Sequence, residues 1–457
     1  TTSGGGNIAI GKDSLIANTT GNTNIAIGTD AMTTNVAGDR NVAVGEQALQ
    51  NMNPSGNVDT YNVGIGYNAG LSITTGTANA FIGGRAGDAT TTGSTNTAVG
   101  TDALSSNTTA SNNVAVGYDC LVSNTSGTQN TAVGAGALDA NTTAANNSAF
   151  GYNALGANTT GANNVGIGQF SLDANTTGDA NTALGHNALT GNTTASKNTA
   201  VGKDALAVNT TGTENVAVGE VALDANTTGN YNTAVGRHAL SSNTTASSNT
   251  AVGRNALGDN TGATNTAVGT DALGSNSTAS DNTAVGRKAL FSNTTGTSNV
   301  AVGETAMLLN VSGNQNTAVG RESLSANTAS DNTAIGRRAL KANTSASNNT
   351  AVGASAGTAL TTGAANVAIG TNALAAATTG ARNTIVGVDS SNQITSGSDN
   401  SAMGYDSLTR CTTGGNNVAI GKDAGDNITG GSSNTCVGLD AGTNITQGDN
   451  NICIGND

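Results

Sequence analysis

The chain has 457 residues, of which 64 are glycine, one is proline and none is tryptophan, and 2% of all residues are aromatic. This composition excludes an ordinary globular core, which depends on the volume of large apolar side chains. A net charge of −13 excludes a general nucleic-acid surface, and a charged fraction of only 10% is unlike a charged disordered chain.

The sequence also limits how the chain can meet a membrane. No apolar run approaches the 18 or so residues that a membrane-spanning helix needs. The chain begins with TTSGGG and ends with GND, part-way through its own repeat at both ends. We therefore expect a segment of a longer polypeptide, with no membrane span in this segment.

One motif, Asn-x-x-x-Gly, returns along the whole chain, from Asn7 to Asn451, in 27 copies. Successive copies start seventeen residues apart, except for a step of 21 from Asn41 to Asn62 and steps of 16 that end at Asn265 and Asn332. The long step contains the only proline and predicts a loop insertion near residues 51–61. No change of composition marks a boundary, so we expect residues 1–457 to form a single continuous repeat array.

Each repeat is numbered 1 to 17 from its Asn. Seventeen residues cannot bury a core alone, so neighbouring repeats must stack to make one. The short, β-prone segment N-T-A-V-G predicts one strand per repeat, paired with the same segment above and below. Alternation places the Val and Ile volume of positions 2 and 4 on one face, and the Ala and Gly of positions 3 and 5 on the other. We expect a partner strand or a neighbouring chain to pack closely against the small face.

Positions 1, 9 and 12 suggest how the inside is filled. Stacked asparagines at position 1 predict a ladder of amide hydrogen bonds, although a simple Asn turn is the alternative. Most repeats have Leu at position 9 and Asn at position 12, whereas repeats with Gly at position 9 usually have a bulky residue at position 12, as in Gly357 with Leu360. One large side chain is thus supplied at either position, never at both, which indicates that the two positions share a pocket.

Nothing in the sequence points to catalysis, a metal or a cofactor. His186 and His238, the only histidines, fall among the variable polar residues of positions 6 and 7. No Ser-His-Asp pattern, paired-Glu motif, zinc spacing or calcium-binding nonapeptide appears. Asp recurs at position 7 but not in every repeat. We expect no enzyme activity.

Basic residues gather at positions 6 and 7 between residues 236 and 338, where stacking would align them into a stripe that could hold an acidic glycan or another polyanion. The alternative, which we favour, is a solvated edge with interleaved Asp and Glu. The stripe, the one candidate surface contact, consists of Arg237, His238, Arg254, Arg287, Lys288, Arg321, Arg337 and Arg338.

Two further motifs have structural explanations. The Asn-Thr-Thr triplets match a glycosylation acceptor, but they fall at positions 12 to 14, where a bend needs these residues without any sugar. Cys436 and Cys453 occupy position 3 of adjacent repeats, about 4.8 Å apart if stacked. A disulfide is possible there, but strands in register rarely offer the right dihedral angle, and two small thiols in place of Ala are the simpler interpretation.

The motif N-[TV]-A-[VI]-G-x-x-A, seen in NVAVGYDC, NVAIGTNA and NIAIGKDS, resembles the head repeats of trimeric autotransporter adhesins (YadA-type) and the repeats of phage tail fibres. The resemblance covers essentially the whole chain, although adhesin head repeats are typically shorter. It implies a left-handed parallel β-roll, assembled as a homotrimer with one turn per repeat. It also implies an extracellular, cell-surface or virion-surface fibre that binds a host or matrix.

These observations predict an all-β parallel β-solenoid of about 27 turns that acts as a structural, adhesive fibre. Repetition would present one weak contact many times and so raise avidity. Two alternatives remain: a passive polymeric filament or sheath subunit, and a Thr-rich face that binds ice or a crystalline polysaccharide. The expected partners are further copies of the chain and a host or matrix surface, with no nucleic acid.

Overall fold

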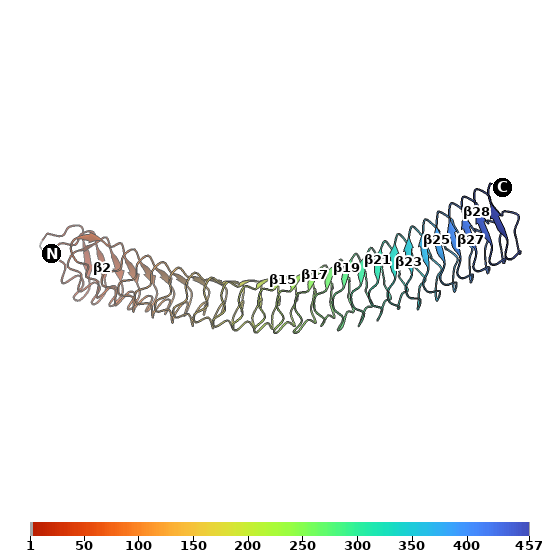
Figure 1. The fold of residues 1–457 in the computed structure, drawn as a ribbon. Helices are drawn as coiled ribbons and strands as arrows, with labels where there is room; N and C mark the ends of the chain where they lie inside the picture. Colours follow the sequence, from red (N-terminus) through yellow and green to blue (C-terminus); the bar gives the residue numbers. More distant parts are fainter. Residues whose placement is uncertain (1–2, 457) are drawn as a thin grey trace. The chain divides into compact units, whose positions relative to one another are not determined.

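The computed structural model describes residues 3–456 and shows an all-β parallel β-solenoid of about 26 turns, with no helix in that range. The chain divides into two units built in the same way, Thr1–Tyr231 and Asn232–Asp457. Within each unit, successive turns lie side by side and each contributes one short strand to a parallel sheet (Figure 1). The predicted coil with one strand per repeat is therefore confirmed.

The strands are three residues long and occupy positions 2 to 4 of each repeat. In the first unit they are β1 (Ile8–Ile10), β2 (Ile25–Ile27), β4 (Val42–Val44), β6 (Val63–Ile65), β7 (Ala80–Ile82), β8 (Thr97–Val99), β9 (Val114–Val116), β10 (Thr131–Val133), β11 (Ser148–Phe150), β12 (Val165–Ile167), β13 (Thr182–Leu184), β14 (Thr199–Val201) and β15 (Val216–Val218). In the second they are β16 (Thr233–Val235), β17 (Thr250–Val252), β18 (Thr266–Val268), β19 (Thr283–Val285), β20 (Val300–Val302), β21 (Thr317–Val319), β22 (Thr333–Ile335), β23 (Thr350–Val352), β24 (Val367–Ile369), β25 (Thr384–Val386), β26 (Ser401–Met403), β27 (Val418–Ile420), β28 (Thr435–Val437) and β29 (Ile452–Ile454).

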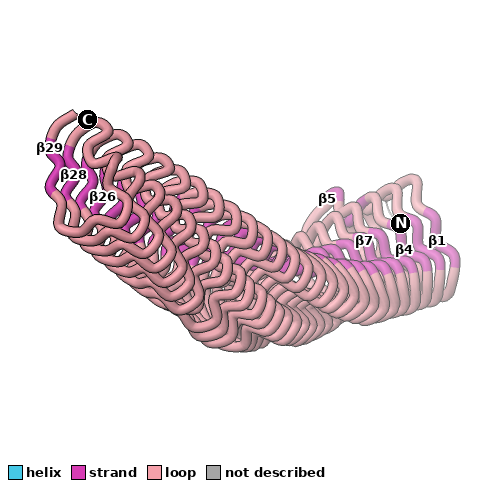
Figure 2. Tube along the Cα trace, turned by 90° about the vertical axis from the view of Figure 1, so that its right-hand side faces the viewer, coloured by secondary structure: helices cyan, strands magenta, loops and turns pink. Residues whose placement is uncertain are grey.

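The sheet keeps its register through the irregular steps. Val42 pairs with Val63 across the insertion, and Thr250 pairs with Thr266 across a 16-residue step. The insertion forms a small second sheet, in which β3 (Gly38–Asp39) pairs with β5 (Val58–Asp59). All strands of the main sheet lie on one side of each turn and loops form the remainder (Figure 2). Added or missing residues are therefore absorbed by the loops.

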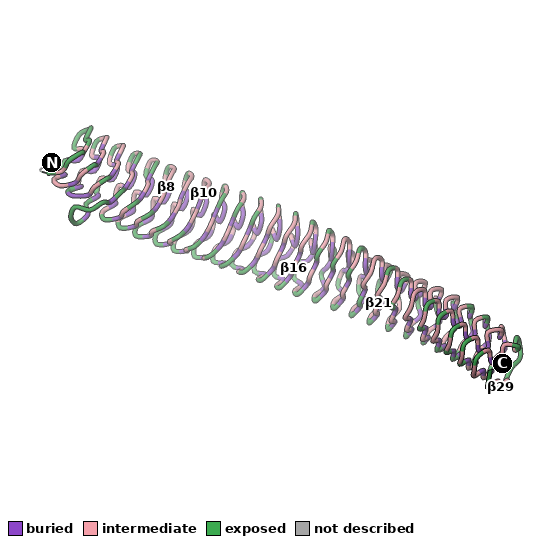
Figure 3. Tube along the Cα trace, turned by 90° about the horizontal axis from the view of Figure 1, so that it is seen from above, coloured by how far each residue is buried: buried purple, intermediate pink, exposed green. Residues whose placement is uncertain are grey.

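The small face of each strand points into the chain's own turn, not toward a partner strand or a neighbouring chain as predicted. The small residue at position 3, such as Ala234, is fully buried, whereas positions 2 and 4, such as Thr233 and Val235, are partly exposed on the outer surface (Figure 3). The close partner of the small face is therefore the inside of the chain's own turn rather than another strand or chain. The interior is narrow, and Ala at position 3 leaves room for the buried Leu of position 9, such as Leu240.

Two constraints require glycine at position 5. The φ angle of Gly236 is 134°, in a region that is essentially open to glycine alone. A Cβ atom at this residue would also lie 2.6 Å from the carbonyl oxygen of Gly253 in the next turn. Any side chain here would strain the backbone and separate two turns.

The corner after the strand alternates between right- and left-handed backbone conformations. His238 at position 7 and Leu240 at position 9 have φ angles of 57° and 53°. Alternation directs amides along the stack in both directions: Asn255 N–H donates to the Arg237 carbonyl of the preceding turn, and Leu240 N–H donates to the Ala256 carbonyl of the next. A left-handed Leu costs about 1–2 kcal/mol, but its complete burial contributes about 1.5–3 kcal/mol. The same geometry explains the frequent Asp and Asn at position 7, which tolerate this conformation.

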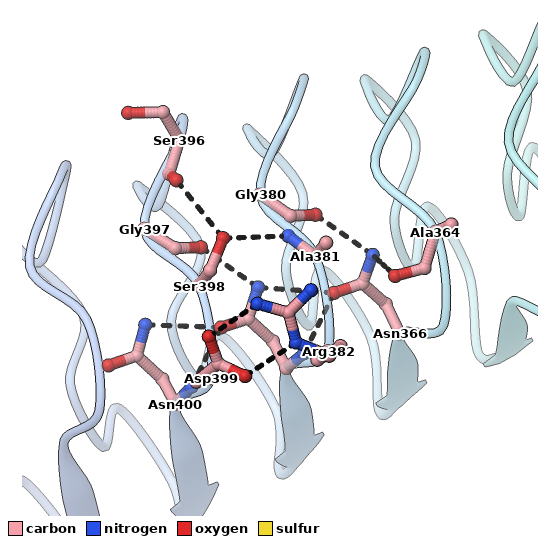
Figure 4. A network of polar contacts seen from close by, with 11 residues as sticks. Ala364, Asn366, Gly380, Ala381, Arg382, Ser396, Gly397, Ser398, Asp399 and Asn400 are labelled. Atoms are coloured by element: carbon pink, nitrogen blue, oxygen red, sulfur yellow. Dashed lines mark hydrogen bonds and ion pairs between the residues drawn. The ribbon is translucent and has the colours of Figure 1, made fainter.

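The predicted asparagine ladder at position 1 is confirmed. The Asn366 side-chain oxygen accepts a hydrogen bond from the Asn383 backbone N–H at 2.9 Å, and the Asn383 oxygen accepts one from Asn400 N–H at 3.0 Å. The Asn366 amide nitrogen donates to the Gly380 carbonyl of its own turn at 2.9 Å (Figure 4). Each position 1 side chain therefore links the backbone of the next turn to the bend of the turn in which it lies. Nearly all of these asparagines are buried.

A second ladder runs at position 12, which the sequence did not reveal. The Asn158 amide donates to the side-chain oxygen of Asn141 at 3.2 Å and to the Gly161 carbonyl at 2.9 Å. The Asn175 amide in turn donates to the Asn158 oxygen at 2.9 Å. Both ladders donate to the carbonyl of position 15, so Gly161 also accepts from Asn147 at 2.9 Å. The two ladders therefore fix the bend from both sides.

The exchange between positions 9 and 12 is confirmed as a shared space. A Cβ atom on Gly425 would lie 3.1 Å from the Ile428 terminal methyl group, so the later residue reaches the space of the missing leucine. The prediction that one turn never holds two large residues is wrong, because Leu49 and Met52 are both fully buried. The next turn makes room for them, since a Cβ atom on Gly64 would lie 2.8 Å from Leu49 Cγ. Volume is balanced between neighbouring turns as well as within one.

A double exchange tests the shared space. Ile428→Asn alone should destabilise the array by about 3 kcal/mol, because it leaves a cavity and a buried amide. Gly425→Leu alone should cost about 1–3 kcal/mol through overpacking against Ile428. The double variant should recover most of both losses in thermal unfolding, and simple additivity of the two single effects would contradict a common pocket.

A second substitution tests the position 1 ladder. Asn299→Leu removes the acceptor of the Asn316 N–H and the donor to the Gly313 carbonyl, bonds of 3.0 and 2.8 Å. The loss should be about 2 kcal/mol or more, because a buried backbone N–H is left unpaired. Hydrogen exchange should accelerate at Asn316. Val300→Thr, on the outer face of the adjacent position, is the control and should leave exchange unchanged.

Candidate functional site

The outer face of the strands is a continuous uncharged strip in each unit. Position 4 is apolar in every turn, and position 2 is Thr, Ser, Ala, Val or Ile. The position 4 side chains remain accessible, with 36% of Val252 and 39% of Ile369 exposed. Charged side chains lie beside the strip, at positions 6 and 7 on one edge and at positions 16 and 17 on the other, as with Arg382 and Asp399 (Figure 4). An uncharged strip with an apolar residue in every turn and a charged border has the arrangement of an interface core and rim.

The predicted basic stripe lies on one of these edges, within the second unit. The structure brings Arg287, Arg321 and Arg338 together around two carboxylates, whereas Arg254 pairs separately with Asp271, 3.7 Å away. Of the other four predicted residues, Lys288 lies over the Phe291 ring at 5.5 Å and His238 lines a nearby groove with Lys288. Arg237 and Arg337 are exposed.

The carboxylates of Glu304 and Glu322 connect the arginines of successive turns. Glu304 pairs with Arg287 and, at 3.6 Å, with Arg321. Glu322 forms ion pairs with Arg321 and Arg338, both at 3.1 Å, and with Lys341 at 2.6 Å. Lys341 lies at position 10, outside the positions from which the stripe was predicted, so its part in the cluster became visible only in the fold.

The cluster keeps its carboxylates ionised. The hydrogen bond from Lys341, together with the charge of Arg338, lowers the pKa of Glu322, and Arg287 lowers the pKa of Glu304. The side chains are exposed, so such pairs contribute little to folding stability. Their main effect is to hold the basic side chains in place along the edge.

A small cluster of aromatic side chains occurs in the first unit. Tyr152 meets Phe170 edge to face with 5.4 Å between ring centroids, and Phe170 meets His186 at 6.5 Å. Phe150, at position 4 beside them, is 40% exposed. The chain has few aromatic residues, and these ones depart from the repeat consensus at positions 4, 6 and 7. That departure is the feature of the sequence from which this cluster could have been predicted.

The Asn-Thr-Thr triplets are corners, as the sequence favoured. Asparagines at position 12, such as Asn158 and Asn192, are fully buried and their amide nitrogens are hydrogen-bonded inside the ladder. The folded turns therefore do not present these amides to a glycosylating enzyme.

The cysteines are free thiols within the stack. Cys436 pairs in register with Cys453, as predicted, and no disulfide joins them. Cys436 is buried in place of Ala, and burial with the adjacent Cys453 raises the pKa of its thiol to about 11. Burial likewise raises the pKa of Cys120 to about 12 and that of Cys411 to about 11. These thiols are protonated and unreactive at neutral pH.

Comparison with known proteins adds no family. No protein-family model matches the chain, and no curated protein matches it in sequence. Among residues 3–456, no group of three or more His, Cys, Asp or Glu side chains is arranged to hold a metal ion. In the same range no helix has the length and apolar character to cross a membrane. What the geometry defines is the class, a parallel β-solenoid repeat protein.

Two carboxyl groups lie close to Gly156, which has no side chain to separate them. A Cβ atom on Gly156 would lie 2.9 Å from an Asp173 oxygen and 3.6 Å from an Asp139 oxygen, two turns apart from each other. Partial burial, followed by the charge of Asp139, raises the pKa of Asp173, and burial is also the main cause of the raised pKa of Asp139.

A raised pKa means that the ionised carboxylate weakens the folded state at neutral pH, and that this penalty fades as pH falls through the raised value. Asp173→Asn should therefore raise the thermal midpoint at pH 7, and the gain should vanish below the ordinary Asp pKa of about 3.9. Asp204→Asn is the control, and it should change the thermal midpoint at pH 7 in the opposite direction, by lowering it. Burial alone would raise the pKa of Asp204, but hydrogen bonds from Asn187 and Lys203 lower it. A gain for Asp173→Asn that persisted at low pH would contradict this account.

Proposed function

We propose that the chain is a structural, adhesive fibre element, displayed outside a cell or on a virion, that attaches to a host or matrix surface. The observation that carries the proposal is the uncharged strip along the strands with charged edges beside it. The strip suits contact between copies of the chain, and the edges suit contact with a surface. The roles are separate because one edge stays accessible while the strip is covered.

The assembly we propose is a homotrimer of left-handed β-rolls, as the resemblance of the repeat motif implies. A strip of partly exposed Val and Ile at position 4 extends along many turns, and long exposed apolar faces of this kind mark association sites. Three parallel copies would cover their strips and present identical edges side by side. Weak contacts repeated on every edge would then act together through avidity.

A second candidate has one specific observation in its favour. Outward threonines stack in register, as with Thr250 on Thr266 and Thr266 on Thr283, and each has an outward Val two residues later. Such a regular face could match ice or a crystalline polysaccharide. The threonine row is interrupted by Val300 and Val367, so self-association is the better supported use of the strip. Thermal hysteresis of a dilute solution would favour this second candidate. A passive filament subunit is the third possibility, and rods joined end to end would favour it.

Native mass measurement tests the assembly. The chain should have three times the mass of one copy, and the triple variant Val252→Lys, Val268→Lys, Val285→Lys should dissociate, because three buried lysines per copy would face one another. Retention on matrix-coated surfaces should fall at the same time by at least tenfold as avidity is lost. Thr270→Lys, a single charge on the exposed edge, is the control. A stable monomer of the unaltered chain would exclude the trimer, and equal retention of both forms would exclude multivalent attachment.

A further inference from the structure

One short part of the second unit has a charge opposite to that of the whole chain. On the edge formed by positions 6 to 11, the four turns that begin at Asn282, Asn299, Asn316 and Asn332 carry six basic side chains and two carboxylates. The basic residues are Arg287, Lys288, Arg321, Arg337, Arg338 and Lys341, and the acidic residues are Glu304 and Glu322. This edge has a surplus of four positive charges in a chain whose net charge is −13.

Half of this surplus lies in a groove, and Lys288 and Arg337 lie outside the residues that line it. Arg287, Arg321, Arg338 and Lys341 line it together with both carboxylates, and its volume is about 410 Å³. The same groove is lined by the hydroxyl residues Thr305 and Ser325 and by the apolar Leu308. Cations, hydroxyl groups and an apolar patch within one depression can recognise a ligand that is anionic, hydroxylated and partly apolar.

The two glutamates leave capacity for such a ligand. A guanidinium group has five N–H donors, and Arg338 uses its Nε on Glu322. Arg337, at position 6 of the same turn, is exposed and has no carboxylate within 4 Å among residues 3–456. Arginine side chains held by one carboxylate are oriented for a second oxyanion, and planar forks bind sulfate or carboxylate groups in pairs.

We propose that this groove, Arg287 to Lys341, binds an acidic polysaccharide through its sulfate or carboxylate groups, a ligand class for the adhesive role proposed above, on which this inference rests. The charged groups would bind Arg321, Arg337, Arg338 and Lys341, and the sugar rings would pack against Leu308. The positive part covers three steps between turns, or about 15 Å. A stiff nucleic-acid duplex extends beyond this length, to turns such as those that begin at Asn349 and Asn366, which carry no basic side chain on this edge. A flexible sugar chain can instead follow the groove.

Binding of dextran sulfate to the full-length chain, with unsulfated dextran of the same length as the reference, tests the proposal. Calorimetry at low salt should show binding to the sulfated polymer alone, with affinity falling at least tenfold between 50 and about 200 mM salt because counterions are released. Arg321→Gln with Arg338→Gln should weaken binding at least tenfold. The matched control is Arg382→Gln, an arginine on the other edge of the same unit that pairs with Asp399 at 2.7 Å, and it should leave binding unchanged.

A second variant separates recognition from folding. Glu304→Gln with Glu322→Gln removes the competing carboxylates, so it should tighten binding at least threefold, which a purely structural role of the cluster would not produce. Three results would overturn the proposal: no binding at low salt, equal loss in the Arg382 control, or tighter binding of duplex DNA than of dextran sulfate. The groove lies within one copy of the chain, so native mass of the same samples distinguishes failure of the assembly from failure of this site.

Discussion

The structure depends on one hydrogen bond that is repeated from turn to turn. The buried Asn at position 1 accepts from the backbone of the next turn and donates to the bend of its own turn, as Asn299 does with Asn316 and Gly313. A turn of seventeen residues has no core of its own, so its place must be set by its neighbours. These amides set it at the corner where the strand begins, and the strand register follows.

The narrow interior is the second constraint, and it follows from the first. Turns held this closely leave space for about one large side chain each, and most of the other inside positions hold a small residue or an amide that bonds to another amide. The position 9 leucine fits only in a left-handed backbone conformation, whose cost is offset by complete burial. Where Gly replaces it, as at Gly425, the later Ile428 fills the same space.

Much of this could be predicted from the sequence because every feature is repeated many times. The period, the single strand per repeat, the first ladder and the exchange of positions 9 and 12 all follow from the spacing of Asn, Gly and Leu. The direction of the strand did not follow, because neither of its faces is charged. The sequence indicated close packing on the small face, but not that this face lies in the chain's own interior, where Ala234 is buried while Val235 is partly exposed. Asn at position 12 resembled an exposed corner, since a buried amide is recognisable only when its partners are known. For the candidate site, the arginines were found by position, but Lys341 and the bridging roles of Glu304 and Glu322 required the fold.

The second ladder ends where position 12 changes from Asn to an apolar residue, as it does after Asn343. At the step from Asn343 to Leu360, the Asn343 side-chain oxygen is buried without a hydrogen-bond partner. Turns within a run of the same kind are interchangeable, because each offers its neighbours the same atoms at the same heights. A gene that gains or loses one whole repeat inside such a run would encode an array with an unchanged interior. A junction placed between runs would instead bring together position 12 side chains that do not continue the ladder. The length of the molecule can therefore vary in evolution by whole turns, and the pattern at position 12 determines where.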